Sequence, residues 1–434
     1  MRLKSILSLA FCGVIASNIA FASELFLMGG AISDTNSNIY TALAKATGKV
    51  ATPNKCSGNW VVTTCPKIAI ITSAAANQAA GDDAYSNDAS GSLSYQHLYS
   101  AYGFSVKHIS AHIDNYQSAT NLNTAEGRTN QTILEQADVV FFNGGDQARH
   151  ARTWLNDEGS DNALMKIIYN RFSQNKLIVA GTSAGTAIQS NPTYGEGSSF
   201  GQLYFASSQG LAVKSVKDGA INGTGLKDTR AASGSLQYLD NGGKMPGFGL
   251  SPSNVLVDTH FDARGRLARL IPALHNTSKQ IGAGVDEDTA FFIKDGVGTV
   301  YGTHGVFIVD NRNASYSSAN YFAGKNFRVS YLTKGDEFIF DNSTVVSTKK
   351  QISKPYYSGH KDSNNITASY ETTTLITRLV DQLDNDNIGY TKAPSDYPRT
   401  TPKFKLYFYK DSQTKGYYTD DFYTVSNALL DISN

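Results

Sequence analysis

The sequence predicts an α/β protein with an open, mostly parallel β-sheet flanked by helices. Several short apolar runs each end in a cluster of Gly, Ser, Asp or Asn residues. The runs are continuously apolar rather than alternating, which is typical of strands that are covered on both faces. Segments with helical character lie between them. Active sites of such sheets collect at the carboxyl ends of the strands.

The strands and helices follow from these runs in order. Strands are expected at 24–28, 67–71, 105–109, 137–142, 176–180 and 255–257, and helices at 36–46, 94–102 and 164–172. From Gly282 onward the pattern becomes β, with runs at 297–309 and 327–340. A helix at 373–383 and strands at 403–409 and 417–425 complete the prediction. The last part therefore reads as a mixed α/β extension.

The chain divides into three predicted segments. Residues 1–22 have a signal-peptide pattern, with Arg2 and Lys4 before an apolar run and Ala20-Phe21-Ala22 at its end. A core helix is the alternative for this stretch. A main α/β domain is expected over 23–346, with a long irregular insertion at about 191–254, and an extension of unknown role over 347–434. No later run is long enough to span a membrane, so the protein is expected to be secreted.

Composition limits the partners and cofactors. A formal net charge of +1 gives no support to nucleic-acid binding or to attraction by a membrane surface. No phosphate-binding or dinucleotide-binding glycine motif occurs, and no cysteine or histidine group has metal-ligand spacing, so neither a cofactor nor a metal is predicted. Cys56 and Cys65 are expected to form a local disulfide, with two free thiols as the alternative. A homodimer is left open.

The strongest chemical signal is the pentapeptide Gly181-Thr182-Ser183-Ala184-Gly185. It follows an apolar strand and precedes a helix-compatible stretch, which is the setting of a nucleophile elbow. Such a turn exposes a serine hydroxyl to a base and to oxyanion donors. Ser183 is therefore the predicted nucleophile. An ordinary glycine-rich turn between strand and helix is the structural alternative.

The base must come from the eight histidines of the chain. His260 is preferred because it follows a buried strand, in Asp258-Thr259-His260, and His150 is the second choice. A lone histidine is more often structural, so position alone leaves this assignment open.

Backbone N–H groups for an oxyanion hole are expected from two turns. The run Gly144-Gly145-Asp146-Gln147 ends a strand, and the N–H groups of Gly145 and Ala184 are the expected donors. A purely structural glycine turn is the alternative. Three arginines, Arg264, Arg266 and Arg269, follow His260 and could grip carboxylates of an acidic substrate, although such a cluster usually marks a solvated helix face.

Together these motifs resemble the cyanophycinases, in the serine-peptidase family that also contains bacterial aspartyl dipeptidase. The resemblance covers roughly residues 24–341, and its carriers occur in the family's order. They are Phe141-Phe142-Asn143-Gly144-Gly145-Asp146-Gln147, Gly181-Thr182-Ser183-Ala184-Gly185, the run from Asp258 to Leu270, and Gly284-Val285-Asp286-Glu287-Asp288-Thr289-Ala290.

The resemblance implies a fold like that of class I glutamine amidotransferases, with Ser183 as nucleophile and His260 as base and without a metal. It also implies that cyanophycin, a poly-aspartate chain with an arginine on each β-carboxyl group, is cleaved to β-Asp-Arg dipeptides. It places Gln147, Asp258, Arg264, Arg266 and Arg269 at substrate-binding positions. For the third triad member the match is loose. Glu196 is the expected residue and Asp258 the local alternative.

Two other classes of function are compatible with parts of the sequence. A lipase or esterase of the α/β-hydrolase type shares the Gly-x-Ser-x-Gly motif, but it needs an upstream His-Gly-Gly type oxyanion motif, which this sequence lacks, and a later base such as His304. A non-catalytic extracellular binding protein on the same fold is the other alternative. The presence of both Ser183 and His260 argues against it.

Overall fold

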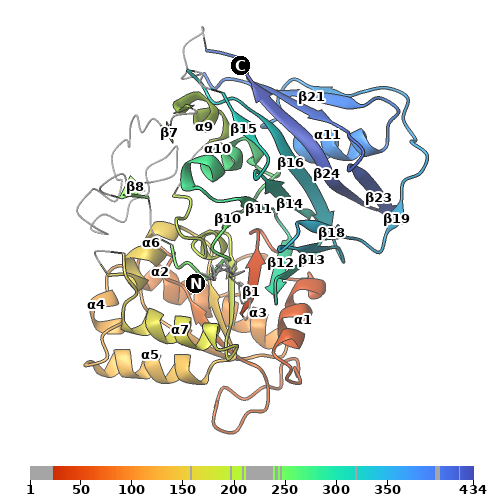
Figure 1. The fold of residues 1–434 in the computed structure, drawn as a ribbon. Helices are drawn as coiled ribbons and strands as arrows, with labels where there is room; N and C mark the ends of the chain where they lie inside the picture. Colours follow the sequence, from red (N-terminus) through yellow and green to blue (C-terminus); the bar gives the residue numbers. More distant parts are fainter. Residues whose placement is uncertain are drawn as a thin grey trace, which may run out of the picture.

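The computed structural model describes residues 23–434 apart from 157–158, 196–197, 208–209, 212–237, 240–242, 245–246, 318–319, 396–400 and 420. Two large β-sheets dominate the chain, one mostly N-terminal and one C-terminal (Figure 1). The predicted signal peptide, residues 1–22, lies outside the described residues, as does much of the predicted insertion at 191–254.

The first sheet has nine strands in the order β18-β17-β13-β12-β1-β5-β4-β2-β3. The five strands from β1 to β3 in this order are parallel, and the other four add to the edge of β1 in antiparallel pairs. In chain order the strands are β1 Glu24–Met28, β2 Lys67–Ile71, β3 Ser105–Ile109, β4 Val139–Phe142, β5 Ile178–Thr182, β12 Thr289–Lys294, β13 Val297–Gly302, β17 Glu337–Ile339 and β18 Thr344–Val346.

The second sheet has eleven strands, and its main path is β10-β11-β14-β16-β24-β22-β21-β20. Only the pairs β10–β11 and β20–β21 on this path are parallel. Its strands are β10 Val255–Asp258, β11 Ile281–Val285, β14 Gly305–Asp310, β15 Ser315–Tyr316, β16 Gly324–Thr333, β19 Lys350–Gln351, β20 Asp362–Ser363, β21 Asp386–Tyr390, β22 Lys405–Tyr409, β23 Lys415–Thr419 and β24 Phe422–Ser433.

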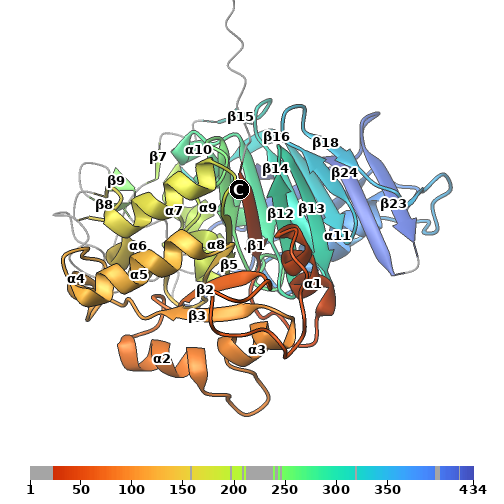
Figure 2. The ribbon, with the colours of Figure 1, turned by 90° about the horizontal axis from the view of Figure 1, so that it is seen from below.

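Helices cover the outer faces of both sheets. They are α1 Ser37–Ala46, α2 Gln78–Ser86, α3 Tyr95–Ala101, α4 Tyr116–Ala119, α5 Ala125–Gln136, α6 Gln147–Trp154, α7 Ala163–Ser173, α8 Ala184–Ala187, α9 Ser199–Phe205, α10 Leu267–Thr277 and α11 Glu371–Val380. Around the parallel strands, α5 and α7 lie on one side, and α2 and α3 lie on the other (Figure 2). Two short hairpins, β6 Ala206–Ser207 with β7 Gly210–Leu211 and β8 Tyr238–Leu239 with β9 Gly243–Lys244, belong to the insertion.

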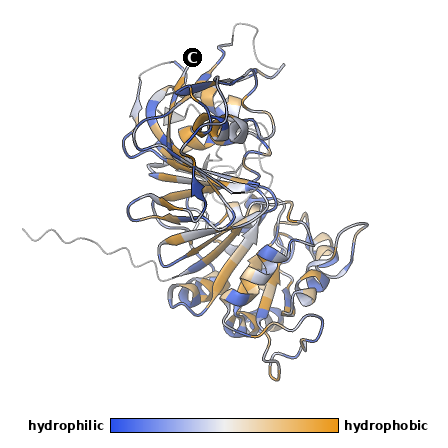
Figure 3. Cartoon of the chain, turned by 90° about the vertical axis from the view of Figure 1, so that its right-hand side faces the viewer, coloured by the Kyte–Doolittle hydropathy of each residue, from blue (hydrophilic) through white to orange (hydrophobic). Residues whose placement is uncertain are grey.

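Alternation along β1 shows why its sequence is apolar throughout. Leu25 and Leu27 point into the core beneath α5 and α7, whereas Phe26 and Met28 pack with α1 and α3 on the opposite face. Successive side chains of a strand point to opposite faces, so a strand covered on both sides must be apolar at every position. The apolar residues follow the strands of both sheets (Figure 3).

The two sheets pack against each other. Val257, Ala283 and Val306 of the second sheet share one core cluster with Phe291 and Val300 of the antiparallel part of the first. The far face of the second sheet is covered by α9, α10 and α11, whose buried side chains form a separate cluster with it. The shared core holds the ends of β5, β10 and β11 in a fixed relation.

The predicted α/β class is confirmed, with differences in the second half. Continuous runs before residue 260 became strands within two residues of the expected bounds, but the sheet gains antiparallel strands from the later β region. The predicted strand at 417–425 is instead a hairpin, in which β23 ends at Thr419 and β24 begins at Phe422. The second sheet contains strands from both sides of the expected boundary at 346/347, because β24 pairs with β16.

Two further features concern the chain as a whole. A disulfide joins Cys56 and Cys65, the pair expected from the sequence. Within the described residues, no helix is both long and apolar enough to cross a membrane.

Candidate active site

Ser183 occupies a sharp turn between β5 and α8. Its backbone lies in the positive-φ region, at φ 52° and ψ −114°, which is unfavourable for a residue other than glycine. The turn needs glycine on both sides, because a Cβ on Gly181 would lie 2.2 Å from the Gly185 carbonyl oxygen and one on Gly185 would lie 2.0 Å from the Phe142 carbonyl oxygen. The N–H of Ser183 donates to the Met28 carbonyl at 3.1 Å, which anchors the turn to the end of β1.

His260 lies two residues beyond β10 and faces this turn. Its Nε2 is 2.7 Å from the Ser183 Oγ, and its backbone N–H donates to the Gly29 carbonyl at 2.9 Å. The imidazole packs directly on Gly30, where a Cβ would lie 2.3 Å from the ring. Burial lowers the pKa of His260 below its ordinary value of 6.5, although the contact with Glu287 acts in the opposite direction. A neutral imidazole at this distance can accept the serine proton.

The carboxylate that orients His260 belongs to Glu287. Its Oε1 lies 2.6 Å from the His260 Nδ1. A proton on Nδ1 is therefore shared with the carboxylate, and the lone pair of Nε2 faces Ser183, which is the arrangement of a catalytic triad. Glu287 follows β11, the parallel neighbour of β10, and Asp258 is level with Gly284 in that pair. The ends of two adjacent parallel strands thus supply the base and its partner.

Glu287 stands where the sequence led us to expect Glu196 or Asp258. Glu196 lies outside the described residues. Asp258 is a correction, because its carboxylate binds arginines rather than His260: Arg269 Nε donates to it at 2.7 Å and Arg266 Nη1 lies 3.4 Å away. The sequence does contain a feature that points to Glu287, because this residue lies in the motif 284–290, which is one of the motifs that carry the family resemblance. It was missed because the β pattern after Gly282 gave no indication that β11 pairs in parallel with β10.

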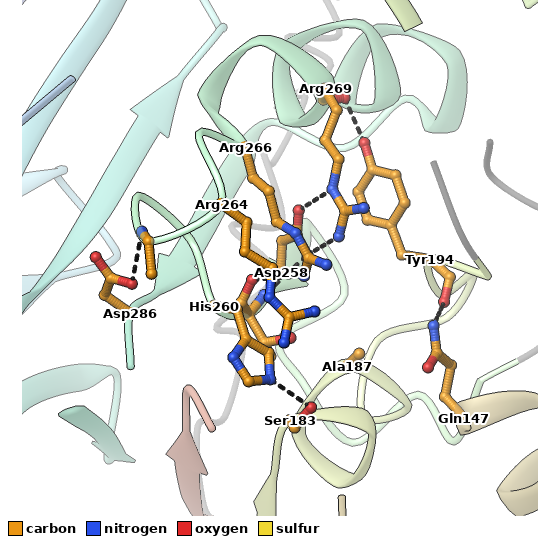
Figure 4. Close-up of polar contacts among 12 residues, drawn as sticks. Gln147, Ser183, Ala187, Tyr194, Asp258, His260, Arg264, Arg266, Arg269 and Asp286 are labelled. Atoms are coloured by element: carbon orange, nitrogen blue, oxygen red, sulfur yellow. Dashed lines mark hydrogen bonds and ion pairs between the residues drawn. The ribbon is translucent and has the colours of Figure 1, made fainter. Parts of the chain in front are cut away.

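Two buried acidic residues lie behind the triad. Asp286 Oδ1 accepts the N–H groups of Glu287 at 2.8 Å and Ala263 at 3.1 Å, so it ties the two catalytic loops together (Figure 4). Asp262 Oδ2 accepts the Thr373 N–H at 2.7 Å. Burial raises the pKa of each carboxyl group to about 6. In the part of the chain that is described, one oxygen of each group is buried without a hydrogen-bond partner.

A polar pocket of about 390 Å³ opens on one side of Ser183, and we call it the arginine-lined pocket. The side chains of Arg264, Arg266 and Arg269 project from the segment after His260 toward it (Figure 4). The guanidinium groups of Arg269 and Arg266 hold the pKa of Asp258 below its ordinary value, even though burial of this carboxyl group, which is 1% exposed, acts to raise it. Burial lowers the pKa of Arg266 to about 10, so it remains a cation at neutral pH.

The three arginines differ in how free they are to bind a ligand. Arg269 is held by Asp258 and lies over the ring of Tyr194, 4.6 Å from its centre. Arg266 Nη1 donates to the Thr259 carbonyl at 2.7 Å. Arg264 is half exposed, and its Nε lies 3.9 Å from Glu287 Oε1. The pocket therefore combines one half-exposed cation with two cations held by Asp258, which suits an anionic ligand.

Other predicted residues of the site line the same pocket. Gln147, at the start of α6, donates from Nε2 to the Tyr194 carbonyl at 2.7 Å and also contacts the Gly195 carbonyl. Gly145 and Ala184 line the pocket beside Ser183. Among the described residues, neither of their N–H groups donates a hydrogen bond. Both N–H groups are therefore free of backbone partners beside Ser183, and their role as oxyanion donors stays a prediction.

The alternative bases lie in other surroundings. His150 is completely buried, with Nδ1 2.7 Å from the Ser73 hydroxyl and Nε2 3.0 Å from the Asn143 carbonyl. Burial lowers its pKa to about 4, which fits a neutral structural histidine. His304 stacks on Tyr370, with ring centres 4.8 Å apart. Within the described residues, no group of three or more His, Cys, Asp or Glu side chains could hold a metal ion.

A serine, a histidine and a carboxylate in hydrogen-bonded series at the strand ends of an α/β sheet form the arrangement of a serine hydrolase. Comparison with known proteins narrows this class. No family model matches the chain. Curated relatives are cyanophycinases, which confirms the predicted resemblance.

The chain is 30% identical over 220 residues to the cyanophycinase of Geminocystis herdmanii, which covers 49% of this chain and 66% of the relative. It is 31% identical over 227 residues to that of Trichormus variabilis, covering 51% and 63%, and 33% identical over 210 residues to that of Synechococcus elongatus, covering 47% and 53%. The chain thus spans somewhat less than two thirds of the length of these relatives.

Two solved structures that match part of the chain are described as peptidases. A peptidase from an acI-B1 Actinobacterium matches with a TM-score of 0.44 and 17% identity, covering 74% of this chain and 97% of that one. A putative peptidase E protein from Listeria monocytogenes matches with a TM-score of 0.35 and 11% identity, covering 65% and 98%.

Proposed function

We propose that this protein is a serine-type peptidase that hydrolyses cyanophycin and releases β-Asp-Arg dipeptides. The observation that carries the proposal is the contact of Ser183 Oγ with His260 Nε2 at 2.7 Å, beside a pocket lined by three arginines. Similarity to curated cyanophycinases supports the choice of polymer. In this polymer the free carboxylates are the α-carboxylates of the arginine branches, and carboxylates are groups that guanidinium side chains bind well.

The proposed reaction follows acyl transfer to serine. His260 Nε2 takes the proton of Ser183 as Oγ attacks the scissile carbonyl, and the N–H groups of Ala184 and Gly145 would receive the developing oxyanion. His260 then delivers its proton to the leaving amine, and water hydrolyses the acyl-enzyme by the same route in reverse. Glu287 holds Nδ1–H and stabilises the imidazolium that forms in both steps.

Export of the protein is part of the proposal. Its support is the charged, apolar and small-residue pattern of residues 1–22, together with the Cys56–Cys65 disulfide, which is typical of oxidising compartments. A polymer-degrading peptidase outside the cell would meet cyanophycin released from other cells.

Ser183→Ala tests the proposal with purified protein and insoluble cyanophycin. We expect turnover to fall by about three orders of magnitude or more without loss of folding. The control is Ser173→Ala, at the exposed end of α7, which should retain full activity. Mass spectrometry of the digest should identify β-Asp-Arg. Intact cyanophycin together with rapid cleavage of a p-nitrophenyl ester would favour the esterase alternative instead.

A further inference from the structure

Ser183 lies between two pockets of opposite character. The second pocket, of about 490 Å³, shares Ser183 and His260 with the arginine-lined pocket. The rest of its lining comes mainly from the segment after β1, from α1, α2 and α3, and from the loop between α2 and α3, and it is closed beside Ser183 by the ends of β1, β4 and β5. We call it the tyrosine-lined pocket, after Tyr40, Tyr95 and Tyr99. Its volume is in the range of ordinary ligand sites. A substrate that passes over Ser183 would place neighbouring units in the two pockets.

The charges of the two pockets are complementary. Arg264, Arg266 and Arg269 give the first pocket its cationic side chains. By contrast, the lining of the tyrosine-lined pocket includes no Lys or Arg, and its acidic side chains are Asp34 and Asp83. The active site is therefore polarised, with cations on one side of the nucleophile and carboxylates on the other.

Asp34 is held in place but is not neutralised. Its Oδ2 accepts the Leu93 N–H at 2.7 Å, and its backbone carbonyl accepts the Tyr102 hydroxyl at 2.7 Å. No ion pair involves Asp34 or Asp83 within the described part of the chain. A fixed, half-buried carboxylate without a cation is a strong acceptor for a guanidinium group.

Two largely buried tyrosine side chains provide a second indication of a ligand. Tyr40 is 2% exposed and Tyr99 is 1% exposed, and both line the pocket. Their rings meet edge to face, with centres 5.8 Å apart. Among the described residues, no hydrogen bond involves either hydroxyl, and neither oxygen is fully sealed from solvent. A phenol oxygen that is accessible and without a partner can accept an N–H group from a bound molecule.

We propose that the tyrosine-lined pocket is a subsite for a guanidinium-bearing side chain of the substrate, with Asp34 as its ion-pair partner. The hydroxyls of Tyr40 and Tyr99 would accept further guanidinium N–H groups, and the aromatic walls would cover the flat face of the group. This inference rests on the proposed peptidase function. It assigns recognition of an arginine branch to the side of Ser183 opposite the arginine-lined pocket.

The test compares two synthetic poly-aspartate oligomers. One carries arginine on its β-carboxyl groups, as cyanophycin does, and the other carries citrulline there. Citrulline has nearly the shape of arginine but no charge, so the ratio of the two kcat/KM values measures recognition of the guanidinium charge. Asp34→Asn is the principal variant, because asparagine retains an oxygen for the Leu93 N–H. Tyr40→Phe removes one hydroxyl, and Glu135→Gln, on the exposed surface of α5, is the matched control.

We expect the wild type and Glu135→Gln to prefer arginine by about ten- to a hundredfold, as for a charged hydrogen-bonded pair. In Asp34→Asn the preference for the arginine oligomer should drop to less than about threefold, and in Tyr40→Phe the preference should decrease less than that. An unchanged ratio in Asp34→Asn, or equal losses on both oligomers, would overturn this inference alone. If the wild type cleaves neither oligomer, the proposed function fails and the inference fails with it.

Discussion

Replacing Glu287 with glutamine is the most informative single change in this site. The carboxylate accepts the proton of His260 Nδ1 at 2.6 Å and so leaves the Nε2 lone pair facing Ser183. A glutamine amide can donate to Nδ1 instead, which favours the tautomer with its proton on Nε2. That tautomer cannot accept the serine proton. The substitution also removes the negative charge that stabilises the imidazolium in the transition state.

The expected loss of kcat in Glu287→Gln can be estimated from the distance between the carboxylate and the imidazolium. With charge centres about 4 Å apart and an effective dielectric constant of about 20, the attraction between carboxylate and imidazolium is about 4 kcal/mol. This corresponds to about a thousandfold in rate, and loss of the correct tautomer adds to it. We therefore expect kcat of Glu287→Gln to fall by a factor of about 10³ to 10⁴.

The assay is release of β-Asp-Arg from cyanophycin under saturating conditions, with the melting temperature measured in parallel. The matched control is Glu196→Gln, the residue favoured by the sequence, which should retain activity if Glu287 orients the base. A kcat of Glu287→Gln within about threefold of the wild type would refute the assignment. So would a Glu196→Gln variant that loses activity while Glu287→Gln does not.

Three other predictions follow from the same site. Because burial lowers the pKa of His260, kcat/KM should rise with pH through an apparent pKa below 6.5 and then level off; a midpoint above 6.5 in the pH–rate profile would contradict this. Gly30→Ala should lower kcat by about a hundredfold, since the added Cβ would lie 2.3 Å from the His260 ring; stopped-flow or steady-state kinetics within threefold of the wild type would show that the ring can move without harm. Asp262 binds its proton more tightly in the folded state, at a pKa of about 6 against 3.8, so the stability it contributes is present below pH 3.8 and is lost as pH rises through 6. Urea unfolding of Asp262→Asn between pH 4 and 7 should therefore show a smaller decline than the wild type, by up to about 3 kcal/mol, and parallel declines would refute the role of this group.

The parallel strands and the nucleophile were predictable because local sequence determines them. Continuous apolar runs that end in glycine clusters located β1, β2, β4 and β5 within two residues. The elbow at Ser183 has a compact signature, since Gly181 and Gly185 are required by backbone contacts only a few residues away. His260 was identified by its position after a buried strand.

The third member of the triad depends on pairing that no local pattern reveals. Glu287 is near His260 because β10 and β11 are parallel neighbours, although 27 residues separate the two side chains in the chain. Asp258, the local alternative for the triad, is excluded from that role because its carboxylate binds Arg269 of the following helix. Strand order in the second sheet also joins β16 to β24 across about a hundred residues, and the composition of 347–434 gave no sign of this.

The triad spans a junction between the two sheets. Ser183 follows a strand of the first sheet, His260 follows a strand of the second, and Glu287 lies in the short segment through which the chain passes from β11 to β12. The segment just after β1 connects these loops, because the Gly29 carbonyl accepts the His260 N–H and the Gly30 carbonyl accepts the Asp288 N–H. Any small sliding of one sheet over the other would separate base from nucleophile while most of the core stayed packed. Catalysis in this protein should therefore fail at a lower temperature or denaturant concentration than the fold itself.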